Sequence, residues 1–205
     1  MRKRGTSYDC VVLASGSPRR QQLIRQMNMK LPIRMLPTDA DECTPQDWTP
    51  QRVVEQLALR KARAARGLLA AEEGGQCPLI IGADTIVALG REVLGKPESP
   101  VHAEQMLGML QGREHSVLTG VACLGSNGSE RVASRSTRVR MLSLAPDRIR
   151  RYVETGEPMD KAGAYAIQGF GAVFVDGIEG CYFNVVGLPL SLLADMLAEF
   201  GIDTV

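Results

Sequence analysis

The stretch "PLIIGADTIVAL" at residues 78–89 constrains the fold of this chain more than any other feature. Its nearly continuous apolar run is typical of a strand that is buried on both faces of a sheet. One acidic residue, Asp84, lies inside that run. Because an unpaired carboxylate is costly to remove from water, we expect cations, a metal or hydrogen-bond donors beside it. A purely structural buried aspartate is the alternative.

The rest of the chain alternates between strand and helix patterns. Strands are predicted at 10–15, 33–40, 115–124 and 131–142, a hairpin arm at 91–96, and helices at 17–28, 49–71, 101–111, 147–154 and after Pro189. A simple doubly wound fold would alternate more strictly, so the order predicts an α/β fold with a mixed, partly antiparallel sheet flanked by helices. No linker divides the chain, so we expect residues 1–205 to form a single domain, as one body or as two closely packed lobes.

Composition excludes several classes of protein. The net charge is +1, and aromatic residues make up only 4% of the chain, which disfavours a surface for nucleic acids. The five cysteines are odd in number and widely spaced, so neither a disulfide framework nor a zinc site is expected. No run approaches the roughly 18 apolar residues of a membrane span, and the start of the chain does not resemble a signal peptide. A cytoplasmic protein without membrane or nucleic-acid partners is predicted.

Two adjacent arginines follow a small turn in "SGSPRR". Ser17 and Pro18 predict the start of a helix there, and the apolar stripe of Leu23, Ile24 and Met27 directs Arg20 inward. The N-terminus of a helix already carries partial positive charge, so Arg19 and Arg20 disfavour each other unless an anion joins them. The alternative is a solvated basic turn with Arg19 pointing outward.

Three further polar residues occupy unusual places. Lys61 interrupts the apolar stripe predicted for the second helix, which consists of Val54, Leu57, Ala65 and Leu68. Its ammonium could bind a ligand or extend to the solvent at the rim of the core. Lys96 ends the hairpin arm, which would bring it back toward Asp84. Gln168, in a glycine-rich stretch at 156–175, can both donate and accept hydrogen bonds. Cations, a buried carboxylate and glycines together suit a polyphosphate ester and a divalent metal.

Successive motifs of the chain resemble those of the Maf family, the septum-formation-inhibitor-like nucleoside triphosphate pyrophosphatases. They are "LASGSPRR", "LALRKA", "IGADTIVALGREVLGKP", "AEQMLGMLQGREHSVLTGVA", "GEPMDKAGAYAIQG" and "NVVGLPL", and they extend in order from about residue 11 to 200. The resemblance implies a fold similar to the inosine triphosphate pyrophosphatase group, with two lobes around a cleft, usually as a homodimer. The implied reaction converts a nucleoside triphosphate to monophosphate and pyrophosphate with Mg²⁺ or Mn²⁺.

The resemblance also implies roles for individual residues. Asp84 falls on the proposed proton acceptor, which could instead be a metal ligand. Four residues fall on phosphate-contacting positions: Ser15, Arg20, Lys61 and Lys96. Glu42 falls on an acidic position that helps to hold the metal, with Asp39 and Asp41 as its competitors in "PTDADECTPQDW".

Three residues match the specificity positions of the family branch that is selective for dTTP and UTP: Arg19, Thr85 and Gln168. Thymine and uracil present an N3–H donor beside carbonyl acceptors, which a fixed Gln amide can match, whereas cytosine reverses that edge. Modified pyrimidine nucleotides are further candidate substrates, and nucleotide-pool sanitation and arrest of cell division are the implied cellular roles. The alternative function is a nucleotide-binding regulator of septum formation without significant catalysis.

Overall fold

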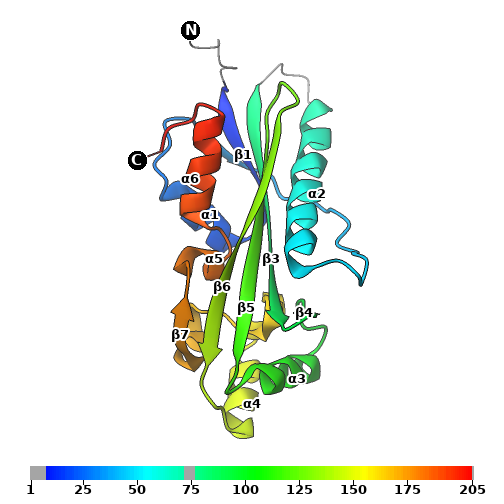
Figure 1. Ribbon diagram of the computed structural model, residues 1–205, viewed down its shortest axis with the longest axis vertical. Helices are drawn as coiled ribbons and strands as arrows, with labels where there is room; N and C mark the ends of the chain where they lie inside the picture. The colour runs from blue at the N-terminus through cyan, green and yellow to red at the C-terminus, as the bar shows by residue number, and fades with distance from the viewer. Residues whose placement is uncertain (1–7, 72–76, 205) are drawn as a thin grey trace. The chain divides into compact units, whose positions relative to one another are not determined.

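The computed structural model describes residues 8–71 and 77–204 (Figure 1). Within these residues one mixed sheet has the strand order β2-β1-β3-β5-β6-β7, with β4 paired to β3. The strands are β1 (Cys10–Ala14), β2 (Ile33–Met35), β3 (Pro78–Leu89), β4 (Glu92–Leu94), β5 (Glu114–Leu124), β6 (Glu130–Met141) and β7 (Val175–Glu179). β1 is parallel to β2 and β3, whereas β4 and β7 are antiparallel to their partners. The predicted α/β fold with a partly antiparallel sheet is therefore confirmed.

The helices of the described residues separate or follow these strands. They are α1 (Pro18–Arg25), α2 (Pro50–Ala70), α3 (Pro100–Leu110), α4 (Pro146–Glu154), α5 (Tyr182–Val186) and α6 (Leu190–Glu199), with 3₁₀ helices η1 (Glu157–Asp160), η2 (Ala162–Ala164) and η3 (Gly169–Phe174). None of the helices in the described part of the chain has the length and apolar character needed to cross a membrane.

The chain divides into two compact units. The first consists of Met1–Asp84, Thr119–Arg135 and Gly187–Val205, and the second of Thr85–Leu118 and Ser136–Val186. Strands β3, β5 and β6 contribute residues to both units. The predicted cleft and the predicted single domain stay predictions.

In the first unit, α2 lies directly against the sheet because glycines occupy the contact points. A Cβ atom on Gly82 of β3 would lie 2.1 Å from the carbonyl oxygen of Ala58, and one on Gly120 of β5 would lie 2.2 Å from that of Val54. No side chain fits in that space, so the helix backbone approaches the strands closely. Ala58 and Ala62 of α2 are fully buried at this contact. A small apolar cluster that includes Val12 and Ile80 completes the packing.

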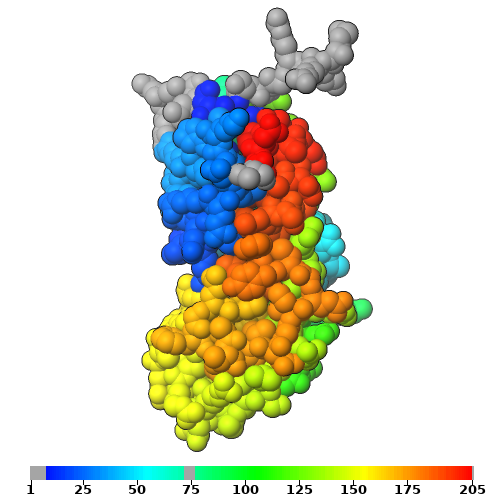
Figure 2. Space-filling view, turned by 90° about the vertical axis from the view of Figure 1, so that its left-hand side faces the viewer, coloured from blue at the N-terminus to red at the C-terminus, as the bar shows by residue number. Residues whose placement is uncertain are grey.

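The two ends of the described chain also meet in the first unit. Figure 2 shows the C-terminal residues in red against the N-terminal segment in blue. The rings of Tyr8 and Phe200 make an edge contact with centroids 6.2 Å apart. Leu193 and Leu197 of α6 are fully buried, as is Ile24 of α1. The predicted apolar stripe of the first helix is therefore confirmed.

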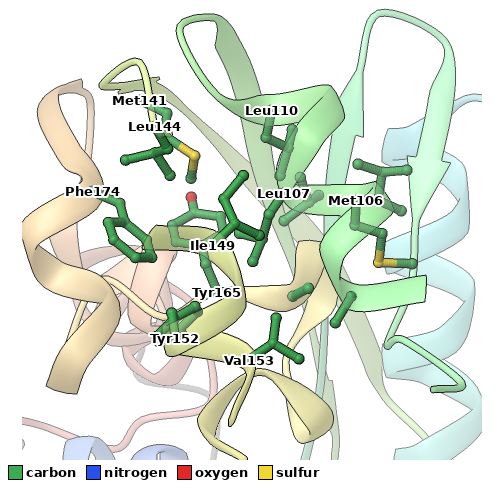
Figure 3. Close-up of a cluster of buried hydrophobic side chains, with 14 of the residues drawn as sticks. Met106, Leu107, Leu110, Met141, Leu144, Ile149, Tyr152, Val153, Tyr165 and Phe174 are labelled. Atoms are coloured by element: carbon green, nitrogen blue, oxygen red, sulfur yellow. The ribbon is translucent and has the colours of Figure 1, made fainter. Parts of the chain in front are cut away.

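The second unit has its own core between α3, α4 and the strands (Figure 3). Leu107 and Leu110 of α3 are fully buried in it. Tyr152 of α4 packs edge-on against Phe174, with ring centroids 4.9 Å apart. These apolar contacts fix α4 and the end of the glycine-rich segment that follows it.

Several predicted boundaries were wrong. β2 ends at Met35 rather than near Ala40, because Pro37 follows with no N–H to donate to a neighbouring strand. α1 ends at Arg25 rather than Asn28, whose φ of 47° is left-handed. β7 and α5 lie in a region where no element was predicted.

The predicted stripe of α2 is confirmed at Val54, Leu57 and Ala65, which are buried, and was wrong at Leu68, which is half exposed. Ala58 and Ala62, which were not predicted, are fully buried. The buried face is therefore turned toward the alanines, because the glycine of β3 leaves room only for small side chains. Lys61 lies next to this face rather than at its centre.

Candidate functional site

Strand β3 continues past the point where its neighbour β1 ends. The last residue pair between them is Ala14 with Gly82, and Asp84 lies two residues farther along β3. From Ala14 the chain leaves the sheet through Ser15, which is buried, and enters α1 at Pro18. Polar groups therefore gather at the carboxyl ends of parallel strands, where open α/β sheets commonly bind ligands.

The turn before α1 is closed by two serines. The Oγ atom of Ser15 accepts a hydrogen bond from the N–H of Ser17 at 3.2 Å. The Oγ atom of Ser17 in turn accepts the N–H of Arg20 at 3.5 Å and caps the helix. The predicted helix start is confirmed, and Ser17 satisfies one of the backbone N–H groups in the first turn of α1.

Lys61 and Asp84 form the centre of the site. Ile80, Gly82 and Asp84 alternate along β3 and so share the face that packs against α2. The Nζ atom of Lys61 on α2 donates to Oδ1 of Asp84 at 2.5 Å, and the two side chains are only 14% and 10% exposed. The buried carboxylate therefore has the cation that its burial requires. Lys61 points to this carboxylate rather than to the solvent.

Glu42 contributes a second carboxylate to the same lysine. Its Oε1 atom lies 2.7 Å from Nζ of Lys61, and its side chain is 54% exposed. Asp41 instead accepts the N–H of Cys43 at 2.9 Å, a bond that lowers the pKa of Asp41. Of these neighbouring acidic residues, Glu42 is the one that the structure places at Lys61. Asp39, the other competitor, is exposed.

Arg20 lies near this charged pair. Its Nε atom donates to the carbonyl oxygen of Gly187 at 2.8 Å, which fixes the direction of the guanidinium. Burial lowers the pKa of Arg20, while the negative charges of Asp84 and Glu42 raise it. The guanidinium of Arg20 stays charged at neutral pH. Arg19, beside it, is half-buried. The first unit thus holds Ser15 and four of the five charged residues of the predicted phosphate and metal site: Arg20, Glu42, Lys61 and Asp84.

The remaining predicted residues belong to the second unit. Thr85 is half-buried and follows Asp84 on β3. Lys96 is exposed and lies two residues beyond the end of β4, whose antiparallel pairing with β3 confirms the predicted hairpin. Gln168 is half-buried and immediately precedes η3. The approach of Lys96 to Asp84 stays a prediction.

The carboxylates of Asp84 and Glu42 were tested as ligands for a divalent metal. In residues 8–71 and 77–204 no group of three or more His, Cys, Asp or Glu side chains could hold a metal ion. Mg²⁺, however, is commonly bound by one or two carboxylates together with substrate phosphates and waters. Both oxygen ligands face one point, the ammonium of Lys61. The pair therefore fits a metal that arrives with a phosphate ligand.

Sequence analysis did not single out Arg60, which holds the loop that carries Glu42. The Nη1 atom of Arg60 donates to the carbonyl oxygens of Cys43 at 2.6 Å and Asp41 at 3.1 Å. The Arg60 guanidinium also lies 5.9 Å from the ring centre of Trp48, where the loop returns to α2. No spacing pattern marks this contact. The only signal was a lone tryptophan just before a helix.

Comparison with known proteins gives one family and many relatives. The family model described as Maf-like protein matches residues 10–200. A dTTP/UTP pyrophosphatase of Pelotomaculum thermopropionicum is 51% identical over 192 residues, which cover 93% of this chain and 96% of that protein. One of Moorella thermoacetica is 50% identical over 195 residues, or 94% of this chain and 96% of the relative. The solved Staphylococcus aureus Ham1 protein matches at 15% identity and a TM-score of 0.47 over 80% of this chain and 79% of that chain, which is too distant to carry an argument.

Proposed function

The chain belongs to the Maf family, and we propose that it is a nucleoside triphosphate pyrophosphatase that converts dTTP and UTP to monophosphate and pyrophosphate. The observation that carries the proposal is the placement of Lys61 against two carboxylates where β1 ends. Relatives named dTTP/UTP pyrophosphatase share about half of their residues with this chain over nearly its whole length, which supports the choice of substrates.

In the proposed reaction, water attacks the α-phosphorus and pyrophosphate leaves. Arg20, Lys61 and Lys96 neutralise the negative charge that builds on the leaving group, without forming any covalent intermediate. Asp84 either accepts the proton of the attacking water or acts as a metal ligand together with Glu42. A bound Mg²⁺ or Mn²⁺ would supply additional positive charge and a more acidic water. Ser15 contacts phosphate beside the N-terminus of α1.

Selection of the base is assigned to Arg19, Thr85 and Gln168. A fixed amide at Gln168 can accept from N3–H of thymine or uracil and donate to a neighbouring carbonyl. Cytosine presents an acceptor at that position, so it would leave polar groups unpaired and be rejected. Ribose and deoxyribose are both expected to be accepted, and modified pyrimidines remain candidate substrates.

The non-catalytic regulator is not favoured, because every residue required by the proposed chemistry is present in a competent form. The proposal also includes a homodimer in the cytoplasm, nucleotide-pool sanitation and a secondary role in septum formation. The homodimer and the two cellular roles rest on the family alone, and the cytoplasmic location rests on the sequence composition.

A panel of nucleoside triphosphates tests the proposal. Pyrophosphate and orthophosphate are both measured with dTTP, UTP, CTP, ATP, GTP and 7-methyl-GTP at one Mg²⁺ concentration. We expect pyrophosphate as the product, with dTTP and UTP hydrolysed well above the others. Orthophosphate as the direct product would indicate a phosphatase, and faster hydrolysis of CTP or 7-methyl-GTP would contradict the base assignment. Full activity in EDTA would contradict the metal while leaving the family reaction in place.

A further inference from the structure

The carboxylate of Glu157 closes the turn that follows Gln168. Its Oε2 atom accepts the N–H of Phe170 at 2.9 Å, and its Oε1 atom accepts the N–H of Gly171 at 2.9 Å. Both donors lie in the first turn of η3, directly after Gln168. One side chain from η1 therefore fixes the main chain on which the proposed base-reading amide is carried.

Glu157 is itself held by the core of the second unit. The hydroxyl of Tyr152 donates to Oε1 of Glu157 at 3.0 Å, and its ring packs against Phe174 (Figure 3). Burial and then the contact with Glu157 raise the pKa of Tyr152, so the phenol stays protonated and donates. Burial works against ionisation of Glu157, but the N–H groups of Phe170 and Gly171 lower its pKa overall. The carboxylate is therefore a charged acceptor at neutral pH, and it receives three hydrogen bonds.

Gly169 shows how little freedom this turn has. Its φ of +73° lies in the left-handed region, and a Cβ atom there would be 2.4 Å from Oε2 of Glu157. Both the backbone angle and the space therefore require glycine. A side chain at this position would displace the carboxylate or the turn.

We propose that Glu157 is a positioning residue for base selection, since it fixes the turn that sets the direction of the Gln168 amide. The inference rests on the proposed role of Gln168 in reading the base. Hydrogen bonds weaken steeply when their angle is wrong, so an amide on a loose turn would discriminate poorly between an N3–H donor and an N3 acceptor. The carboxylate of Glu157 is bonded to two main-chain N–H groups and to Tyr152, so its effect should appear as a change in preference between nucleotides.

The test compares Glu157→Gln with the wild type through kcat/KM for dTTP, UTP and CTP. The Gln side chain keeps the size but places an NH₂ group against one of the two backbone N–H donors. We expect the dTTP to CTP preference to fall about tenfold, the scale of one lost hydrogen bond, while kcat/KM for CTP changes less than about threefold. Amide hydrogen exchange at Phe170 and Gly171 should become faster.

Two more variants and one control complete the test. Gly169→Ala disturbs the same turn through its main chain. Tyr152→Phe removes the hydrogen bond to Glu157 while keeping the ring. Both variants should reduce the preference for dTTP over CTP. They decide the question if Glu157→Gln does not fold. Glu154→Gln, an exposed residue one turn away, should change nothing.

Two outcomes overturn the inference in distinguishable ways. If the folded variants slow every nucleotide in parallel and keep the wild-type preference, Glu157 is merely structural and the proposed function stands. If the wild type itself does not prefer dTTP and UTP to CTP, the base selection is absent and both proposals fail.

Discussion

The two units hold their proposed functional side chains by different means. In the first unit, long charged side chains from α2, β3 and the loop before α2 meet one another directly, with Lys61 between Asp84 and Glu42. In the second unit, Gln168 is carried by a main-chain turn that is hydrogen-bonded to Glu157. One arrangement depends on charge and the other on backbone geometry.

The difference suits the two parts of a nucleotide. Coulomb attraction falls slowly with distance, so a cation keeps most of its effect when the phosphates of different substrates lie at slightly different positions. A hydrogen bond to a base edge has strict distance and angle requirements, and it discriminates only when its partner is rigid. We therefore expect changes in the first unit to alter the rate for all nucleotides alike, and changes around Glu157 to alter the choice among them.

The largest expected effect comes from Asp84→Asn. The amide cannot accept the proton of water or hold a metal with the same charge, so kcat should fall about a thousandfold for every nucleotide. Pyrophosphate release measures the loss, and circular dichroism together with nucleotide binding should show an intact fold. Asp195→Asn, an exposed residue of the same unit, is the matched control. Full turnover by Asp84→Asn would remove this carboxylate from the mechanism.

The second unit should be the part that fails first in acid. His115 is buried, its Nε2 atom bonds the hydroxyl of Tyr165 at 2.7 Å, and its Nδ1 atom has no partner among the described residues. Burial lowers its pKa from 6.5 to about 4. As the pH falls, His115 is therefore protonated in the unfolded chain before it is protonated in the folded chain. The stability that the neutral His115 contributes to the folded state is complete above about pH 7 and is lost as the pH falls from 6.5 toward 4.

This acid sensitivity can be measured against His115→Gln, which can still bond Tyr165 but does not titrate. Between pH 7 and pH 4.5 the free energy of unfolding of the wild type should fall about 2 to 3 kcal/mol more than that of the variant. Urea unfolding at both pH values gives the difference. Equal losses in the two proteins would mean that His115 is protonated without cost.

Arg20, Lys61 and Asp84 were predicted from short-range periodicity, whereas Ser15 and Glu42 were predicted only from the resemblance to the family. Asp84 stood out because a carboxylate interrupted a doubly buried strand, and Lys61 because a lysine fell among apolar positions of a helix. Their contact follows from the close packing of that helix against that strand at Gly82. The pairing of β3 and β4 was likewise visible, because a hairpin joins neighbours in sequence.

The parts that escaped prediction depend on contacts between distant segments. Glu157 and the turn at 169–171 are separated in sequence, and the sequence pattern of neither segment predicts their contact. Arg60 donates to backbone carbonyl oxygens, and because every residue has one, the sequence does not show which of them accept. The burial of Ala58 and Ala62 on α2 is of the same kind, because the position of the helix is set by Gly82 on another element.

Gly82→Ala tests whether the close approach of α2 creates the charged centre. The added methyl group would meet the backbone of α2, so the free energy of unfolding should fall by about 2 kcal/mol. Lys61 would move away from Asp84, and activity should fall equally for all nucleotides. Gly67→Ala is the matched control, because a Cβ atom there meets nothing within 4 Å and should stabilise the helix by about 0.5 to 1 kcal/mol. A Gly82→Ala protein as stable as the wild type would show that this packing is adaptable.

The smallest expected effect is that of Arg60→Ala. It tests the comparison most directly, because Arg60 in the first unit and Glu157 in the second have the same structural role. Each holds a loop through two main-chain hydrogen bonds, Arg60 by donating to carbonyl oxygens and Glu157 by accepting N–H groups. Arg60→Ala should release the loop of Glu42 and lower kcat/KM about fivefold, with the same factor for dTTP, UTP and CTP, because Glu42 keeps its own ion pair with Lys61.

Arg63→Ala is the control for Arg60→Ala, since Arg63 lies one turn along α2 and pairs with Glu130 instead. Its removal should leave kcat/KM unchanged, because an exposed ion pair contributes little. A decrease with Arg60→Ala that differs between thymine and cytosine nucleotides would break the comparison, since the loop of Glu42 would then also affect the reading of the base. An equal decrease for dTTP, UTP and CTP would mean that loosening the loop of Glu42 changes the rate without changing the choice of base. Loosening the turn held by Glu157, tested through Glu157→Gln, is expected to change that choice.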